Sequence, residues 1–162
     1  MRWLLCLLLA LAAPGWAQLQ DLDGRPHSVA ELTADHQATV LVVWCSRCHS
    51  CRGVEGELAS FAREGVKLYA VDPHPADDAQ RVRSFLAEQG LSLEVLLDPA
   101  QSFLTGFGID RTTTALVFDQ AGKLRYFGPF QDYAAAAVEE VVSGHEVTVP
   151  TRPLQGCPIP RL

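Results

Sequence analysis

The chain has 162 residues, of which 48% are hydrophobic and 20% charged, and its formal net charge is −6. This length fits one domain, and the apolar content is enough for a buried core, so a disordered chain is not expected. The balance is acidic, and nothing in the sequence resembles the basic footprint of a nucleic-acid-binding protein, so nucleic acid is not an expected partner.

The first 17 residues differ from the rest. Arg2 is their only charged residue, and residues 4–13 form an apolar run that is too short to span a membrane. Pro14 and Gly15 break this run, and small residues at positions 15 and 17 fit a signal-peptidase site. We therefore expect a cleavable signal peptide over residues 1–17 and a secreted or periplasmic protein, in which disulfides can form. An uncleaved anchor is the alternative.

A short N-terminal hairpin followed by a helical turn is predicted next, over residues 19–32. Asp23-Gly24 is a strong turn signal. Ser28, followed three residues later by Glu31, is typical of a capping box at the start of a helical turn.

Apolar patterns then predict strands that alternate with helices. The predicted strands are residues 38–44, 66–71, 93–97, 115–118 and 123–127, and the predicted helices are residues 48–64, 79–89, 133–142 and a short helix from Pro99. Strands separated in this way indicate βαβ units, and the last two strands form an antiparallel hairpin. We expect an α/β fold with a central mixed sheet flanked by helices. The expected division is a signal peptide (1–17), one domain (18–147) and an extended, proline-rich tail (148–162) that contains Cys157.

Three cysteines, Cys45, Cys48 and Cys51, lie within seven residues directly after the predicted central strand. This placement puts Cys45 at a helix N-terminus, where unpaired N–H groups stabilise a thiolate. Arg47 and Arg52 add positive potential. Cys48 has the spacing of a two-residue disulfide ring, so we expect Cys45 to be the exposed, attacking sulfur and Cys48 to resolve the mixed disulfide. An inert structural disulfide is the alternative interpretation.

Trp44-Cys45-Ser46-Arg47-Cys48 resembles the WC-x-x-C site of the thioredoxin superfamily. Residues 21–26 resemble the entry hairpin of the secreted TlpA/ResA-like branch of this superfamily. Residues 107–128 resemble the stretch YGVRGTPTTFLIDxDGKIxxxxxG of the same branch. The C-terminal residues 144–150 and 156–159 resemble the ends of bacterial redoxin-domain proteins.

This resemblance covers nearly the whole chain after residue 17. It implies a thioredoxin-like three-layer fold and thiol–disulfide oxidoreductase activity that needs no cofactor. The implied partners are thiols or disulfides of exported proteins, or an electron donor in the membrane. No particular oligomeric state is implied.

Two positions depart from the family pattern. Thr113 stands where the family has a cis-proline that packs beside the disulfide and helps to hold an extended substrate. Because a cis bond is costly without proline, we expect a trans Thr112–Thr113 bond and altered substrate binding. Thr39 stands where thioredoxin has a buried Asp, so the predicted strand offers no carboxylate as a proton shuttle. His49 is a candidate for this role, and the alternative is a solvent-facing side chain.

The other two cysteines each allow two interpretations. Cys51 shares a helix face with Cys48, so it is either a second resolving thiol or a small buried hydrophobe. Cys157 is either a third redox cysteine that exchanges with Cys45 or Cys48, or part of a bridge to Cys51 or to another molecule.

Two kinds of binding module compete with the oxidoreductase. Residues 45–49 match the CxxCH pattern of c-type haem attachment, but the alternating strands and the absence of methionine beyond Met1 oppose it. The second kind of binding module is a soft-metal site for Cu or Zn. Its ligands would be Cys45, Cys48, Cys51 and His49.

A peroxiredoxin-like antioxidant protein is the remaining alternative. The family's Pro and Thr before the reactive cysteine correspond here to Ala38 and Val42, and its Arg corresponds to Thr113. The groups that activate peroxide are therefore not expected.

Overall fold

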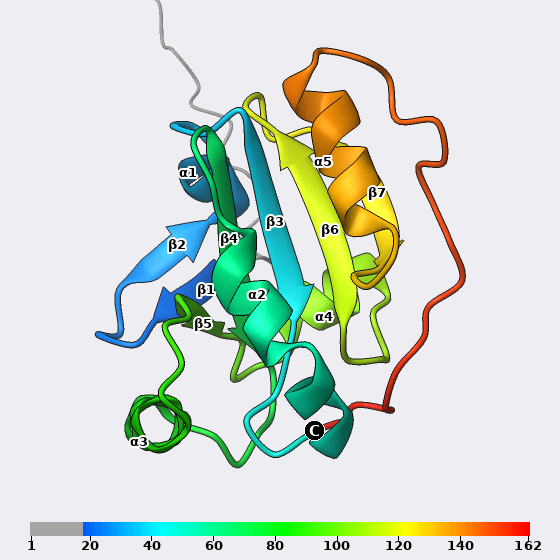
Figure 1. Cartoon of the computed structure of the whole chain (residues 1–162). Coiled ribbons are helices and arrows are strands. Elements are labelled where there is room, and N and C mark those ends of the chain that lie inside the picture. The colour runs from blue at the N-terminus through cyan, green and yellow to red at the C-terminus, as the bar shows by residue number, and fades with distance from the viewer. Residues whose placement is uncertain (1–17) are drawn as a thin grey trace, which may run out of the picture.

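The computed structural model describes residues 18–162, and the predicted signal peptide lies outside the described residues. Within this range the strands form one mixed sheet in the order β2-β1-β5-β4-β3-β6-β7 (Figure 1). The strands are β1 (Gln18–Asp21), β2 (Pro26–Ser28), β3 (Ala38–Val43), β4 (Val66–Asp72), β5 (Val95–Leu97), β6 (Thr114–Asp119) and β7 (Leu124–Pro129). β3, β4 and β5 run parallel, whereas β6 and β7 add antiparallel strands.

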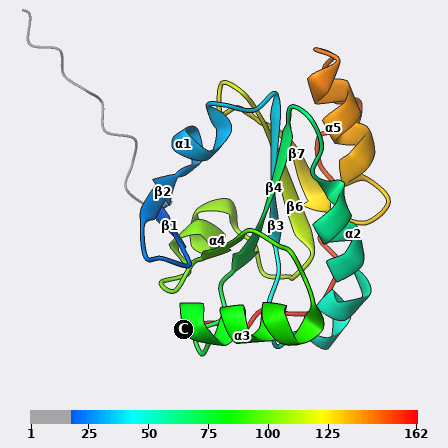
Figure 2. The ribbon, with the colours of Figure 1, turned by 60° about the vertical axis from the view of Figure 1, so that its left-hand side comes forward.

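Helices cover both faces of the sheet, with α2 and α5 on one side and α1 and α4 on the other (Figure 2). They are α1 (Val29–Thr33), the 3-10 helix η1 (His49–Gly53), α2 (Glu55–Phe61), α3 (Ala79–Gln89), α4 (Ser102–Phe107) and α5 (Ala134–Val142). β3 is buried along its whole length because Val40 and Val42 join one core while Leu41 and Val43 join the other. In residues 18–162 no helix is long and apolar enough to cross a membrane.

Local sequence signals predicted several elements closely. The Ser28 hydroxyl accepts the Glu31 N–H at 3.3 Å, and the Glu31 carboxylate accepts the Ser28 N–H at 2.7 Å, so the predicted capping box is confirmed. The prediction of α3 over residues 79–89 is also confirmed, and Gly90 ends that helix in a left-handed conformation.

The segment after β3 differs from the single helix predicted over residues 48–64. A loop leads to η1, and the α-helix begins only at Glu55. A 3-10 helix has three residues per turn, so Cys51 and Val54 fall on the same line and are both buried. Cys45 therefore precedes a 3-10 helix and does not occupy the N-terminus of an α-helix.

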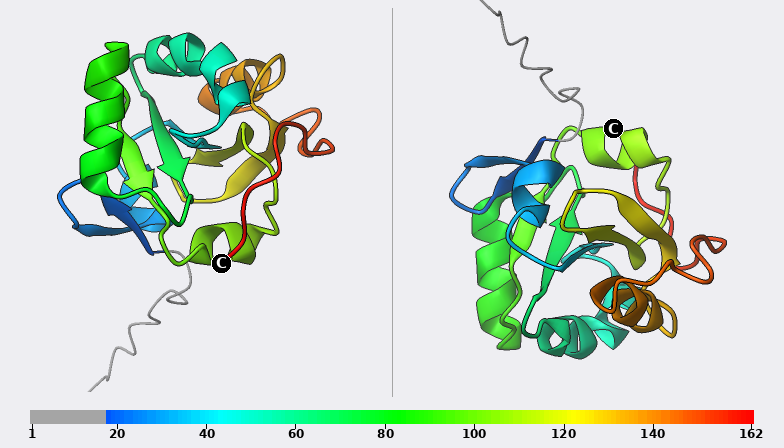
Figure 3. Two further views of the ribbon diagram at one scale, coloured as in Figure 1. Left: turned by 90° about the horizontal axis from the view of Figure 1, so that it is seen from below. Right: turned by 90° about the horizontal axis from the view of Figure 1, so that it is seen from above.

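The C-terminal residues 148–162 fold back along the domain. They leave α5, pass the β7 edge and reach the end of the sheet where β3 stops (Figures 1 and 3). Isolated bridges join Thr151 to Phe127 and Pro158 to Arg111. Ile159 is 7% exposed and belongs to one of the two cores, so the tail is packed against the fold.

Candidate functional site

Three of the cysteines meet at the carboxyl end of β3. Cys45, Cys48 and Cys157 line one hollow of about 200 Å³. The rest of its lining is Arg47, His49, Pro73, His74, Thr112, Pro158, Ile159 and Pro160. A turn holds the first two cysteines together, because the Cys48 N–H donates to the Cys45 carbonyl at 3.1 Å.

Cys45 is not the exposed, acidic thiol that its place after a strand suggested. It is 5% exposed. Burial, followed by the charge of Asp72, raises the pKa of Cys45 to about 12, although the Arg47 N–H donates to its Sγ at 3.3 Å. The expected lowering was wrong for two reasons: no α-helix begins here, and the side chain lies under other residues.

Cys48 and Cys51 lie one 3-10 turn apart and differ in exposure, although the Cys51 thiol interacts with both Cys48 and Thr112. Cys48 is half-buried, and its Sγ lies 3.5 Å from the Thr112 hydroxyl. Cys51 is fully buried in the core that contains Trp44, and burial raises the pKa of the Cys51 thiol. Cys48 is therefore the sulfur of the CxxC motif with the greater exposure, and Cys51 packs as part of the core.

The predicted positive groups are engaged elsewhere. The Arg47 guanidinium donates to Asp77 at 2.5 Å and to the Ala76 carbonyl at 3.0 Å. Arg52 lies over the Phe85 ring, with its guanidinium carbon 4.8 Å from the ring centroid. Arg47 thus reaches Cys45 through its backbone N–H.

A buried carboxylate absent from the sequence-based site lies beside Cys45. Asp72 ends β4, is 2% exposed, and accepts the N–H groups of Ser46 at 3.3 Å and His74 at 2.9 Å. Burial, together with the charge of Asp77, raises the pKa of Asp72 to about 7. Thr39 offers no carboxylate on β3, as expected, but the neighbouring strand supplies one.

Asp77 completes this carboxylate pair. Its side chain is buried and accepts the Ser46 hydroxyl at 2.6 Å and the Arg47 guanidinium. Burial opposes ionisation, but these two donors outweigh it and lower the pKa of Asp77. Of the two carboxyls, Asp72 is therefore the one that takes up a proton as the pH falls through neutrality, while Asp77 stays ionised. The signal for Asp72 was its place after a buried run parallel to β3, since carboxyl ends of parallel strands meet at one sheet edge.

These groups also form a potential ligand set. Ligand atoms of Cys45, Asp72 and Asp77 lie within 4.8 Å of one another. This set has one sulfur and two carboxylates, which differs from the predicted soft-metal ligands, and His49 is exposed. Because both carboxylates already accept hydrogen bonds from Ser46, Arg47 and His74, we interpret the cluster as a proton-holding network.

The loop before β6 is tied to both the sheet and the cysteines. No cis peptide bond occurs in residues 18–162, so the expected trans Thr112–Thr113 bond is confirmed. Thr113 has φ of +61°, which is rare for a β-branched residue, and its N–H donates to the Val43 carbonyl at 2.6 Å.

Trp44 anchors the other side of the site. It is fully buried, its indole N–H donates to Glu55 at 3.2 Å, and its backbone N–H donates to the Val71 carbonyl at 2.9 Å. These bonds fix the residue that precedes Cys45, so Trp44 acts as a support for the cysteine.

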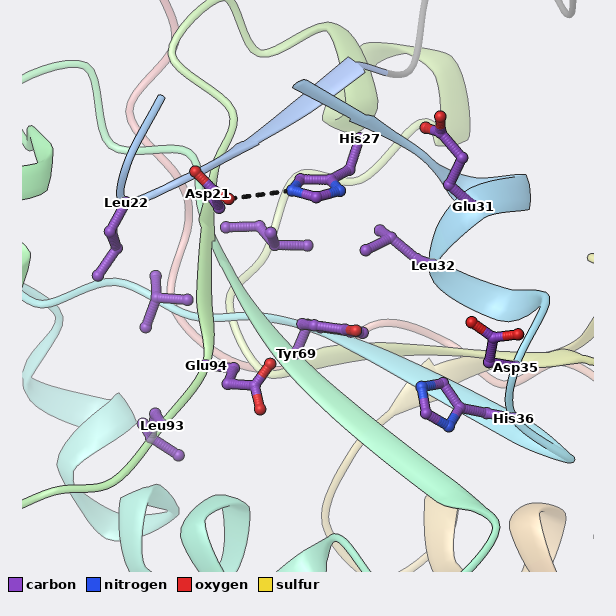
Figure 4. Close-up of a pocket in the computed structure, with 12 residues that line it drawn as sticks. Asp21, Leu22, His27, Glu31, Leu32, Asp35, His36, Tyr69, Leu93 and Glu94 are labelled. Carbon is purple, nitrogen blue, oxygen red and sulfur yellow. Dashed lines mark hydrogen bonds and ion pairs between the residues drawn. The ribbon is translucent and has the colours of Figure 1, made fainter. Parts of the chain in front are cut away.

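A second hollow of about 470 Å³ lies away from the cysteines (Figure 4). Three of its four acidic side chains have partners. Asp21 binds His27 at 3.1 Å, Glu31 caps α1, and Glu94 pairs with Lys67. No cysteine lines this hollow, so the candidate redox site is confined to the smaller one.

Comparisons with known proteins agree with this fold. The profile of the AhpC/TSA family matches residues 11–127. Thiol-disulfide oxidoreductase ResA of Bacillus thuringiensis (strain Al Hakam) is 28% identical over 82 residues, which are 50% of this chain and 46% of that protein. The match thus spans about half the length of this relative.

Solved structures resemble the chain over a larger share. A hypothetical protein of Sinorhizobium meliloti 1021, SMc02350, has a TM-score of 0.74 at 25% identity and covers 88% of this chain and 89% of its own. A thioredoxin-like protein of Aeropyrum pernix has a TM-score of 0.60 at 19% identity, with 79% and 88% covered. The predicted thioredoxin-like α/β fold is confirmed.

Proposed function

Because the chain belongs to the AhpC/TSA family, we propose that it is a thiol–disulfide oxidoreductase whose reactive pair is Cys45 and Cys48. The observation that carries this proposal is their position: one turn joins them at the carboxyl end of β3, and both line the same hollow. The relatives named thiol-disulfide oxidoreductase support the same chemistry.

The reaction is an exchange of one disulfide for another. Cys45 loses its proton to the ionised form of Asp72, which is present near neutral pH because the pKa of Asp72 is about 7. The Cys45 thiolate attacks a substrate disulfide, forms a mixed disulfide and releases one substrate thiolate. Cys48 then attacks the Cys45 sulfur, which forms the Cys45–Cys48 disulfide and releases the second substrate thiol.

The tail controls access to Cys45. Pro158 and Pro160 line the hollow together with Cys45, which is 5% exposed while they are in place. A substrate disulfide therefore reaches this sulfur only after the tail moves. The site thus favours a substrate segment that is extended and able to replace the tail.

The apolar N-terminal segment and the reactive pair together favour an extracytoplasmic location. There the substrates are cysteine thiols or disulfides of exported proteins, with a membrane electron donor as the second class of partner.

A thiol peroxidase is the second candidate, since the matching family profile is AhpC/TSA. Ala38 and Val42, which replace the Pro and Thr of the peroxiredoxin pattern, are fully buried in β3 and carry no hydroxyl. Peroxide therefore finds no donor there, and disulfide exchange is the better-supported activity.

The test combines exchange with glutathione disulfide and mapping of the products. We expect Cys45→Ser to abolish exchange and Cys48→Ser to accumulate a glutathione adduct on Cys45. Cys51→Ala, a matched change of a core cysteine, keeps the exchange rate. Hydrogen peroxide should be consumed no faster than by the Cys45→Ser variant. Full exchange in both serine variants would show that the pair is wrongly assigned, and rapid peroxide turnover would favour the peroxidase.

A further inference from the structure

The tail is docked on the site by its backbone. The Thr112 N–H donates to the Cys157 carbonyl at 2.9 Å, and the Cys157 N–H donates to the Thr112 hydroxyl at 3.3 Å. Two residues later, the Ile159 N–H donates to the Asp110 carbonyl at 2.9 Å. Together with the antiparallel bridge between residues 111 and 158, these bonds seat the tail as a short strand beside the loop before β6.

Anchors on both sides hold this short strand in place. Beyond it, Gln101 donates to the Pro160 carbonyl at 2.7 Å, and Arg161 donates to the Ile109 carbonyl at 2.6 Å. Before it, the Arg152 N–H donates to a β7 carbonyl at 3.0 Å. Cys157 is consequently presented at a defined point of the hollow.

Gly156 permits the close approach that this seat requires. Its φ is +105°, and a Cβ at this position would lie 2.2 Å from the Thr112 carbonyl oxygen. Only glycine tolerates both conditions, so the residue directly before Cys157 is adapted to docking against Thr112.

Cys157 and the CxxC motif line the same hollow. Thr112 contacts both partners, with its hydroxyl 3.5 Å from the Cys48 Sγ and 3.3 Å from the Cys157 backbone nitrogen. Cys48 and Cys157 are both half-buried and line the same hollow, whereas Cys45 lies deeper. Of the two CxxC cysteines, Cys48 is thus the one that shares with Cys157 both a half-buried position and a contact with Thr112.

We propose that Cys157 is a third redox cysteine, which takes over the disulfide from the Cys45–Cys48 pair by attacking Cys48. This step rests on the proposed function, because that function creates the Cys45–Cys48 disulfide. The Cys157 thiol loses a proton and its sulfur bonds to Cys48, while the Cys45–Cys48 bond breaks and Cys45 takes up one proton. One disulfide replaces another, so the step needs no external oxidant or reductant.

The exchange returns Cys45 to the thiol form and places the disulfide at the half-exposed end of the site. There an external dithiol, such as that of a partner protein, reaches it without entering the cavity over Cys45. The tail therefore connects the buried nucleophile to the reducing partner.

Trypsin separates the candidate partners, because it cleaves after Arg47 and Arg52. Cys45 lies in the peptide that ends at residue 47, Cys48 and Cys51 share the peptide 48–52, and Cys157 lies in the peptide 126–161. The full-length protein is oxidised with one equivalent of glutathione disulfide, quenched with acid, alkylated and digested. We expect a linked 48–52/126–161 species, and we expect it to persist in Cys51→Ala, which assigns the bond to Cys48.

Two variants make the test decisive. Cys157→Ala should accumulate the Cys45–Cys48 disulfide instead, and this also checks the proposed function. Gly156→Ala retains all cysteines but strains the seat, so the linked species should fall about tenfold, with Trp44 fluorescence as the check on folding. If the wild-type protein forms only Cys45–Cys48, the third-cysteine proposal is overturned and the proposed function stands. If Cys157→Ala forms no Cys45–Cys48 bond, the proposed function itself fails.

Discussion

Asp72→Asn tests whether the buried carboxylate beside Cys45 is a proton-holding group. Burial raises the pKa of Asp72 from 3.8 to about 7. The folded protein therefore binds the proton more tightly than the unfolded chain, and its stability is full below about pH 4 and falls as the pH rises to about 7. At about 1.4 kcal/mol for each tenfold change in proton affinity, the loss is about 4 kcal/mol, which local relaxation and water entry reduce.

Urea unfolding measured by Trp44 fluorescence, at a series of pH values from 4 to 8, reports this loss. Trp44 is the only tryptophan after residue 17. Asp72→Asn should match the wild type at pH 4 and exceed it in stability at pH 8. Asp35→Asn, which removes an exposed carboxylate, is the matched control and should leave the pH dependence unchanged.

The same substitution should act on Cys45. The charge of Asp72 is one cause of the raised pKa of Cys45, so Asp72→Asn should lower that pKa, as measured by thiolate absorbance in a Cys48→Ser, Cys51→Ala, Cys157→Ala background. If the wild type and Asp72→Asn gave parallel stability curves and equal Cys45 titrations, Asp72 would be no part of the proton balance of this site.

Two further substitutions probe the supports of the site. Cys51→Ala should lower the free energy of unfolding by about 1 kcal/mol in urea titrations, because Cys51 is fully buried in the core, while the rate of glutathione exchange stays unchanged. Thr113→Pro should lower it by about 3 kcal/mol, because the Thr113 N–H bonds to Val43 and its φ of +61° is closed to proline. Thr113→Gly should raise the free energy of unfolding by about 1 kcal/mol, because glycine adopts a positive φ without strain. Equal stability of the two Thr113 variants would show that the backbone at this position is not strained.

The sequence predicted the fold well because its strongest signals are local. The apolar run 38–44 becomes a strand buried on both faces, and the residues Ser28 and Glu31 cap α1. Each of these signals depends on neighbours in the chain and on the period of apolar residues, so no tertiary information is needed to interpret them.

The site was predicted only in part because its remaining groups come from distant segments. Asp72 lies 27 residues beyond Cys45, and it reaches the cysteine because β3 and β4 are parallel neighbours. The pKa of Cys45 depends on its burial and on the charge of Asp72, neither of which a local sequence pattern reports. The prediction of one helix over residues 48–64 was wrong for a similar reason. Burial of Cys51 together with Val54 favours a 3-10 turn over the α-helix that the apolar spacing suggests.

The threonine at position 113 and the cysteine of the tail are structurally connected. In the thioredoxin superfamily, which this chain resembles, a cis-proline at this position helps to hold an extended substrate. Here Thr113 needs its N–H for Val43, and the adjoining Thr112 gives its own N–H and hydroxyl to Cys157. The N–H and hydroxyl of Thr112, next to that position, are thus already bonded to the tail. A Cβ at Gly156 would also lie 3.0 Å from the Thr113 hydroxyl, so the tail packs closely against the loop before β6 at this residue. Proline at position 113 would lose the bond to Val43, and an external segment that binds Thr112 must compete with the tail for the same groups.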